Sequence, residues 1–296
     1  MRVPRLTPRS ALIGLHVGAL MFGLSGIFGK LILAAPLVIV FGRALFGLAA
    51  LGGAFAGHLA AQPRPSLRQA AALAGSGLLL CAHWLTFFLA VKVGNVAVAT
   101  LGFASFPAFT VLLEGLLFRE RIRRAEYLVV GLVCLGLVLV TPNLDFSQGA
   151  TAGLFWGIVS GLLFALLSLA NRASVRGLDP ILSAFAQNLT IVLCLAPLAL
   201  FELPKVRALD WLWLVLLGVL CTGVAHSLFV ASLQLIKART AAVIFALEPV
   251  YGIAFAAVLF GEQPSLRMLA GGALIIFATF LSARSAALGT HAGAIP

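Results

Sequence analysis

The hydrophobic positions of this sequence fall into long apolar runs that are separated by short polar breaks. An α-helix needs about 20 apolar residues to cross the roughly 30 Å hydrocarbon core of a bilayer, and the runs have about this length. The alternation of apolar and polar positions that marks β-strands is absent from them. The pattern predicts an all-α, polytopic membrane protein with ten transmembrane helices, at 10–30, 36–57, 68–91, 95–118, 124–141, 149–171, 179–201, 209–235, 239–260 and 265–286.

Composition supports a membrane protein. Of the 296 residues, 62% are hydrophobic and 10% are charged. A soluble domain of this length needs more polar surface, so lipid must face most of the side chains. Basic residues Arg2, Arg5 and Arg9 precede the first run, as in a signal peptide. However, the run continues past about 18 residues without a small-residue cleavage site, so we interpret it as a retained first span.

The charge distribution predicts an orientation. The formal net charge is +11, but the Lys and Arg residues form short clusters between the apolar runs, so no nucleic-acid partner is expected. Positive residues near the ends of spans resist translocation and stay in the cytoplasm. Most of the 20 Lys and Arg residues lie on one side if the amino terminus is cytoplasmic. An even number of spans then leaves both termini in the cytoplasm.

The two halves of the chain resemble each other. FPAFTVLLEGLLFRERIRRAEYLVVGLVCLGLVLV aligns with EPVYGIAFAAVLFGEQPSLRMLAGGALIIFATFLS, so that Pro107 matches Pro249 and Glu120 matches Glu262. Each half holds five predicted spans, and because five is odd the second copy must enter the membrane from the opposite face. We therefore predict two inverted five-helix repeats, at 1–143 and 144–296.

Inverted repeats have a functional implication. The two copies can exchange conformations, so that a site near the middle of the membrane opens first to one face and then to the other. The repeat therefore indicates a transporter that works by alternating access. The alternative is that the duplication only packs ten helices together.

Three features together carry a family resemblance: the five-plus-five arrangement, the proline in the fourth helix of each half, and the glutamate that closes that helix in LLFRE and VLFGE. The chain resembles the EamA family of the drug/metabolite transporter superfamily, and within it is similar to YddG-type exporters of aromatic amino acids. The resemblance implies a basket-like bundle around a central cavity in the bacterial inner (plasma) membrane. It also implies export or facilitative transport of small organic solutes, above all neutral and aromatic amino acids, without catalytic residues or cofactors.

Pro107 and Pro249 are candidate hinges in the fourth and ninth spans. Each proline removes the hydrogen bond to the carbonyl four residues earlier, at Phe103 and Phe245, so both helices should kink there. Their symmetric placement favours hinges that move during transport, and static kinks are the alternative.

Glu248 precedes Pro249 within an apolar span. An unpaired carboxylate at this depth costs about 2.5–3.5 kcal/mol on insertion scales, so the side chain should face protein or water. As a substrate-binding residue it could hold an ammonium group or a proton. It could equally bridge to a neighbouring donor such as Arg43.

The second and seventh spans, which correspond in the repeat, contribute three further polar candidates. Arg43 could hold a substrate carboxylate with paired N–H donors. The alternative is that its side chain snorkels to the helix end or joins an ion pair. Gln187 and Asn188 would add uncharged donors and acceptors for a zwitterion.

Histidine and aromatic side chains complete the candidate site. His83 and His226 occupy nearly equivalent places in the two halves. They could bind substrate or relay protons, although a buried neutral histidine is the commoner outcome. Trp84, Trp156 and Tyr251 are candidate aromatic walls that would stack on aromatic solutes and attract ammonium groups. Packing against lipid is the default for any one of them.

The sequence lacks the signature motifs of several other protein classes. The cysteines show no metal-ligand spacing, so neither a metal site nor a disulfide framework is expected. The absence of a Walker-type loop, a Ser-His-Asp set and an HExxH motif argues against ATP-driven export and against a membrane-embedded enzyme. The expected partners are the lipid bilayer, a small-molecule substrate and, for a coupled carrier, protons. A multidrug or metabolite exporter and a channel-like permease are the alternatives, and the chain is expected as a monomer or a homodimer.

Overall fold

The computed structural model describes residues 7–117, 124–140, 149–171, 178–225 and 247–292, together with 227, 228, 232 and 244; for 125 and 282–292 it describes the backbone alone. The described part of the chain is helical. Its elements are α1 (Pro8–Leu31), α2 (Pro36–Ala61), α3 (Leu67–Val93), α4 (Val96–Phe103), α5 (Phe106–Leu117), α6 (Arg124–Val140), α7 (Gly149–Ala170), α8 (Pro180–Glu202), the 3-10 turn η2 (Leu203–Lys205), α9 (Ala208–Gly218), the π-helical turn η3 (Val219–Val224), α12 (Glu248–Phe260) and α13 (Leu266–Ala292).

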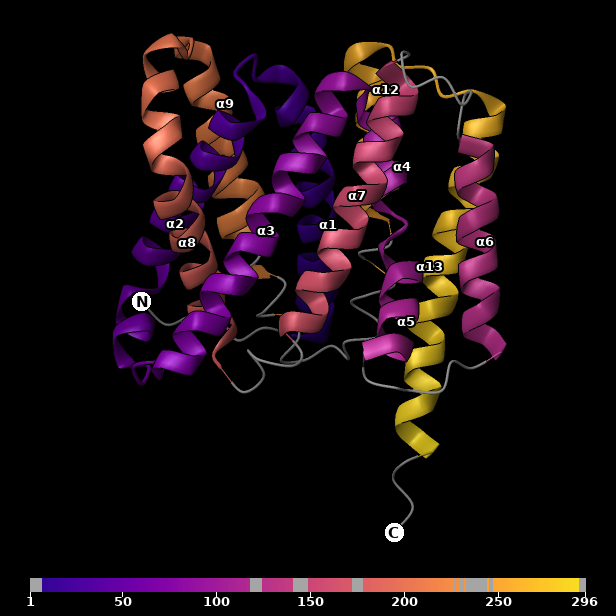
Figure 1. Ribbon diagram of the computed structural model, residues 1–296, viewed down its shortest axis with the longest axis horizontal. Coiled ribbons are helices and arrows are strands. Elements are labelled where there is room, and N and C mark those ends of the chain that lie inside the picture. The colour runs from indigo at the N-terminus through magenta and orange to yellow at the C-terminus, as the bar shows by residue number, and fades with distance from the viewer. Residues whose placement is uncertain are drawn as a thin grey trace.

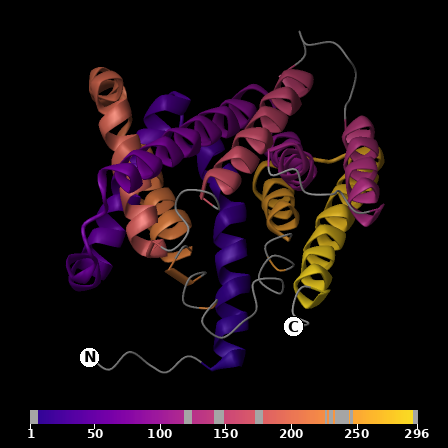
Figure 2. The same ribbon diagram turned by 60° about the horizontal axis from the view of Figure 1, so that its bottom comes forward.

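The helices run side by side in one bundle (Figure 1). At one side α2 packs against α8 and α9, and at the other side α6 pairs with α13, as a second view also shows (Figure 2). Between these groups α7 packs along α3, α4 and α5, while α1 packs against α12. Helices that are far apart in the sequence therefore hold the bundle together.

One end of the bundle, which we call the Glu262 end, is where α1, α3 and α12 finish and α4 and α7 begin. Lys30 of α1 pairs there with Glu262, which follows α12 and reaches the backbone of Val96 in α4. The carbonyl of Val93 in α3 lies against Gly149 of α7. Consequently α1, which ends at the Glu262 end, and α7, which begins there, run in opposite directions.

Six helical segments are long and apolar enough to cross a membrane: Pro8–Leu31, Pro36–Ala61, Leu67–Val93, Val96–Leu117, Gly149–Ala170 and Pro180–Lys205. Shorter apolar helices cover Glu126–Val140, Ala208–Val224, Glu248–Phe260 and Leu266–Leu281. Large apolar side chains such as Phe201 and Val258 are 78% and 83% exposed, as expected where lipid is the solvent. The predicted helical membrane fold is confirmed, while the number of ten crossings stays a prediction.

Local sequence signals set several helix starts. Thr7 and Ser66 form capping boxes with Ser10 and Gln69 at the starts of α1 and α3. The Asn95 side chain accepts a backbone N–H from the first turn of α4. These side chains satisfy N–H groups that have no partner within the helix, and such groups are costly in or near lipid.

The fourth predicted span is broken at its proline. α4 ends at Phe103 and α5 begins at Phe106, because Pro107 has no N–H to bond to the Phe103 carbonyl. The predicted kink is confirmed here, whereas movement about it stays a prediction. Pro249 lies in the first turn of α12, where a missing N–H is tolerated. Phe245, whose carbonyl is predicted to lose its hydrogen bond because of Pro249, lies outside the described residues.

Glycines bring α4 and α7 into backbone contact. A Cβ added to Gly102 would lie 3.0 Å from the Cα of Gly157, and one added to Gly161 would lie 2.9 Å from the Phe103 carbonyl oxygen. Small residues at a helix interface allow this close approach in membranes, where packing drives helix association. The broken fourth span is therefore fixed against α7 at its break.

This interface predicts a stability difference between two glycine substitutions. In Gly157→Ala the new methyl group would meet the Ala99 carbonyl oxygen at 2.8 Å, and we expect overpacking to lower stability by about 1–3 kcal/mol. Gly131→Ala in α6 is the matched control, because an added Cβ meets nothing there within 4 Å and alanine favours helix by about 0.5–1 kcal/mol. Thermal unfolding in detergent measures both. Equal melting temperatures for the two variants would contradict the packing described.

Candidate functional site

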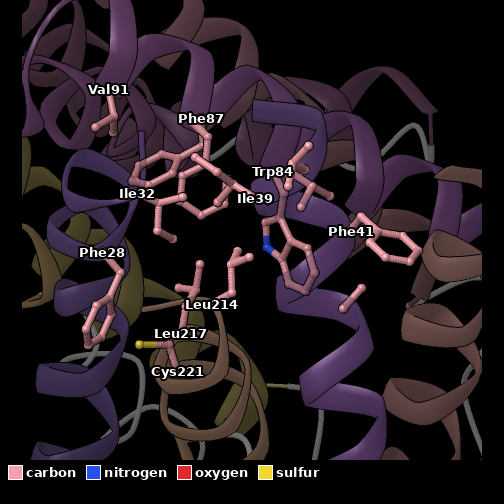
Figure 3. Packing of buried hydrophobic residues seen from close by; sticks show 14 of the residues in the cluster. Phe28, Ile32, Ile39, Phe41, Trp84, Phe87, Val91, Leu214, Leu217 and Cys221 are labelled. Carbon is pink, nitrogen blue, oxygen red and sulfur yellow. The ribbon is translucent and has the colours of Figure 1, made fainter. Parts of the chain in front are cut away.

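An apolar core surrounds Arg43, one of the predicted polar residues. Figure 3 shows Phe28 of α1, Ile39 of α2, Trp84 of α3, and Leu214 and Cys221 from the α9–η3 segment, which belong to one buried cluster. The cluster joins helices from both halves of the chain. Polar groups among these side chains must find their partners within the protein.

Arg43 lies within this core with 4% of its surface exposed. The guanidinium carbon lies 4.0 Å from the centroid of the Trp84 ring and 5.9 Å from that of Phe88, within the range of cation–π attraction. Its Nε donates a hydrogen bond of 3.1 Å to the Oγ1 of Thr222. Arg43 thus points into the bundle, and the alternative that it snorkels to the helix end is wrong.

The partner of Arg43 sits on an irregular turn. Thr222 belongs to η3, a π-helical turn of a kind that often occurs at functional sites. A Cβ added to Gly47, one turn below Arg43 on α2, would lie 2.8 Å from the Thr222 Cγ2 and 3.4 Å from the Asn188 Oδ1. Asn188 is buried, and its Nδ2 donates to the Ala184 carbonyl while its Oδ1 has no hydrogen-bond partner among the described residues. An acceptor is therefore open beside Thr222.

Glu248 occupies the first turn of α12 and is half-buried. Its charge and that of Arg43 interact, but the ion pairs of the described residues do not include these two groups as direct partners. At 1.5 Å per helical residue, Arg43, Trp84 and Glu248 lie about 10, 14 and 18 Å along their helices from the Glu262 end. All three therefore lie well inside the bundle, between its two ends.

His83 is fixed in the core by Ser160 of α7. Its Nδ1 lies 3.1 Å from the Ser160 carbonyl oxygen and 2.8 Å from the Ser160 hydroxyl, which donates to the His83 carbonyl at 3.1 Å. The imidazole also contacts Phe103 and Phe164, with ring centroids 5.2 Å and 5.1 Å away. His83 therefore links α3 to α7 within an aromatic group at the break of the fourth span.

The remaining candidates do not all meet at Arg43. Gln187 donates to Asn171 at the end of α7, over 3.0 Å. Trp156 packs edge-on against Phe155, with centroids 5.4 Å apart, and borders the core cluster. Tyr251 points its hydroxyl toward the Nδ1 of His16 at 3.3 Å, at the interface of α1 and α12. His226 lies outside the described residues.

Two hydroxyl side chains that contact the predicted residues, Thr222 and Ser160, were not predicted from the sequence. Each is a hydroxyl inside an apolar run, which was the available signal. Most such hydroxyls bond to the carbonyl four residues earlier, as Thr190 does to Ala186. Only the packing of α9–η3 against α2, and of α7 against α3, distinguishes Thr222 and Ser160 from them.

The Glu262 end is held together by charged groups from several helices. The Lys30 Nζ lies 2.6 Å from the Glu262 Oε1 and 4.4 Å from the centroid of the Phe260 ring. The Glu262 carboxylate also accepts the backbone N–H groups of Val96 and Ala97, each at 3.4 Å. One carboxylate thus ties α1, α4 and the end of α12 together, and its negative charge suits a helix amino terminus.

A second tie lies at the opposite end. The His58 Nε2, near the end of α2, lies 3.0 Å from the Asp179 Oδ2, and the other carboxylate oxygen accepts the N–H of Leu182 at 2.9 Å. Burial alone would raise the pKa of Asp179, but the hydrogen bonds from Leu182 and His58 outweigh it and hold that pKa below its ordinary value. Asp179 therefore caps α8 as a carboxylate.

These features define the class of the protein. A multi-pass helical bundle with an apolar exterior and charged groups at its centre is typical of membrane transporters. The family model described as the EamA-like transporter family matches this chain twice, over residues 9–141 and 151–284. The chain belongs to the EamA-like transporter family, and it is a membrane transporter.

Individual relatives agree with this assignment. The chain is 23% identical over 271 residues to the "Uncharacterized transporter YxxF" of Bacillus subtilis, covering 90% of this chain and 87% of that protein. It is 28% identical over 200 residues to an "Uncharacterized transporter" of Archaeoglobus fulgidus, covering 67% and 71%. A solved crystal structure with 19% identity superposes with a TM-score of 0.61 over 94% of this chain and 99% of its own. That likeness concerns the fold alone.

The His83–Ser160 contact predicts a localised loss of stability. Ser160→Ala removes the hydroxyl that joins α7 to His83 of α3 and leaves buried polar groups short of a partner, so we expect a loss of about 1–3 kcal/mol. Ser168→Ala is the matched control, because among the described residues that hydroxyl bonds to Phe164 of its own helix alone. Unfolding in detergent is the measurement. A loss as large in Ser168→Ala as in Ser160→Ala would refute the inter-helix role.

Proposed function

We propose that this protein exports small organic solutes, most of all neutral and aromatic amino acids, by alternating access across the bacterial inner membrane. The single observation that carries the proposal is the placement of Arg43, Trp84 and Glu248 well inside the bundle, with the Arg43 guanidinium against the Trp84 ring. Charged side chains at this depth are costly and usually mark a solute pathway. The aromatic rings beside them suit an aromatic or apolar solute side chain.

Inverted halves, at 1–143 and 144–296, are part of the proposal. The first helices of the halves, α1 and α7, run in opposite directions, and each packs against the fourth span of the other half, α1 on α12 and α7 on α4 and α5. The second helices, α2 and α8, pack together, as do the fifth, α6 and α13. This exchange of partners supports a pseudo-two-fold axis in the membrane plane.

The contacts at the Glu262 end support alternating access. In the proposed orientation, with cytoplasmic termini, this end faces away from the cytoplasm. Lys30 and Val96 belong to the first half and Glu262 to the second, so the ties at this end join the two halves. The halves must separate here when the central site opens outward, and Pro107 and Pro249 are the proposed hinges.

Solute counterflow into liposomes tests the function. We expect unlabelled aromatic amino acid inside the vesicles to stimulate uptake of the labelled compound, because a carrier must return through its own cycle. Trp84→Ala should reduce this uptake by about 3- to 30-fold through loss of the ring beside Arg43. Glu248→Gln should also reduce it. Tyr127→Ala, on an exposed face of α6, is the aromatic control and should transport normally.

The counterflow result separates the competing functions. Uptake without trans-stimulation would indicate a channel-like permease, and a chemically altered solute would indicate an enzyme. Transport of drugs or other metabolites but of no amino acid would retain the carrier and overturn its proposed substrate class.

The Glu262 end predicts a change in access. Glu262→Gln weakens the contact with Lys30 and should favour the state that is open at this end, so that a membrane-impermeant maleimide added there labels Cys221 about 10-fold faster. The labelling uses a variant in which the other cysteines are replaced. Glu202→Gln, which removes a local pair with Lys205, is the matched control and should leave the rate unchanged. Unchanged labelling in Glu262→Gln would show that this pair does not hold the halves closed.

A further inference from the structure

We propose that Arg43 is the anchor for the carboxylate of the transported solute, and that Thr222 is the positioning residue that aims it. This inference rests on the proposed function and narrows its substrate class to zwitterions that carry a free carboxylate. It depends on the charge, the burial and the hydrogen-bond geometry of Arg43 in the described part of the chain.

Among the residues that the structure describes, the charge of Arg43 has no direct counter-ion. The side chain is 4% exposed, and the ion pairs of the described residues leave it out. A guanidinium stays charged in proteins, so a buried one needs an anion or several acceptors. Trp84 offers the attraction of its ring face, which is weaker than a direct ion pair in a dry interior. A bound carboxylate would supply the missing negative charge.

The contacts of Arg43 leave the edge of the guanidinium that carries its two NH₂ groups available to a carboxylate. Nε is occupied by Thr222, and one face is covered by Trp84. Within the described residues, the bond from Nε is the one hydrogen bond that the Arg43 side chain makes. The two terminal NH₂ groups together form the planar fork that matches the two oxygens of a carboxylate.

Nearby groups indicate how a zwitterion would lie. Glu248 is not paired directly with Arg43 in the described part of the chain, and its carboxylate form would attract an ammonium group that lies between them. The open Oδ1 of Asn188, beside Thr222, could accept a further N–H. A carboxylate on Arg43 with its ammonium toward these acceptors describes the backbone end of an α-amino acid.

Thr222 acts through Arg43 and needs no contact with the solute. The π-helical turn Val219–Val224 places its hydroxyl against Nε. Without that acceptor the guanidinium could turn and lose the alignment of its NH₂ fork. If Thr222 positions Arg43, removal of its hydroxyl should weaken binding of the carboxylate and change the maximal transport rate little. Serine at this position should restore the binding, because serine keeps the hydroxyl.

Counterflow with a pair of solutes tests the anchor. The wild-type protein should take up phenylalanine with a KM about 10-fold or more below that of phenylalanine amide, whose carboxylate is neutralised. Arg43→Gln should raise the KM for phenylalanine by about 10- to 100-fold and leave that for the amide nearly unchanged. Thr222→Val should raise the KM for phenylalanine alone, by about 3- to 10-fold, and Thr222→Ser should restore it. Thr190→Val is the control, because the Thr190 hydroxyl bonds to Ala186 of its own helix.

The outcomes distinguish the anchor from the proposed function. If phenylalanine and its amide are transported alike and Arg43→Gln impairs both equally, the carrier function stands and the anchor is wrong. If the wild-type protein transports neither solute, the proposed function fails for this class. Thermal stabilisation of the purified protein by each solute then tests the role of Arg43. Phenylalanine should stabilise the wild-type protein more than the amide does, and this difference should vanish in both Arg43→Gln and Thr222→Val. Equal stabilisation by both solutes would overturn that role.

Discussion

The centre of this protein depends on the interaction of one buried positive charge, that of Arg43, with the aromatic rings around it. Arg43 cannot lose its charge, and lipid cannot solvate it, so the surrounding helices must. Trp84 of α3 covers the guanidinium, and Thr222 of η3 accepts its Nε–H. Glycines at the contacts of α2 with α8 and α9 allow the helices to approach closely enough for these partners to reach it. The packing of one side of the bundle is thus linked to the placement of one charge.

The bilayer imposes a second constraint, on the backbone. An N–H or carbonyl that faces lipid without a partner costs several kcal/mol, so a broken helix is tolerated only where protein covers it. The break between α4 and α5 meets this condition because Gly161 of α7 lies against the Phe103 carbonyl. The same break adjoins His83 and its aromatic neighbours. Irregular backbone and polar side chains therefore occur at the same depth as Arg43.

The two ends of the bundle are held by different chemistry. At the Glu262 end a carboxylate joins α1, α4 and the segment after α12, whereas at the opposite end His58 contacts Asp179, which caps α8. Both ties link elements that lie far apart in the sequence, and neither is buried as deeply as the contacts of Arg43. Ties of this kind can be broken without disturbing the core, which is the property that the proposed alternating access requires.

The sequence by itself determined the helical membrane fold, the duplicated pattern, the family and the kink at Pro107, because length, hydropathy and proline chemistry act locally. It also drew attention to Arg43, Trp84 and Glu248, since charges and large aromatic rings are conspicuous in apolar runs. It could not decide whether Arg43 snorkels, nor single out Thr222, Ser160 or the open oxygen of Asn188. These depend on which helices meet and on how they are rotated, and a hydroxyl in an apolar run looks the same whether it bonds its own helix or a neighbour. Only the tertiary structure decided that, because the contact exists between segments that the sequence holds far apart.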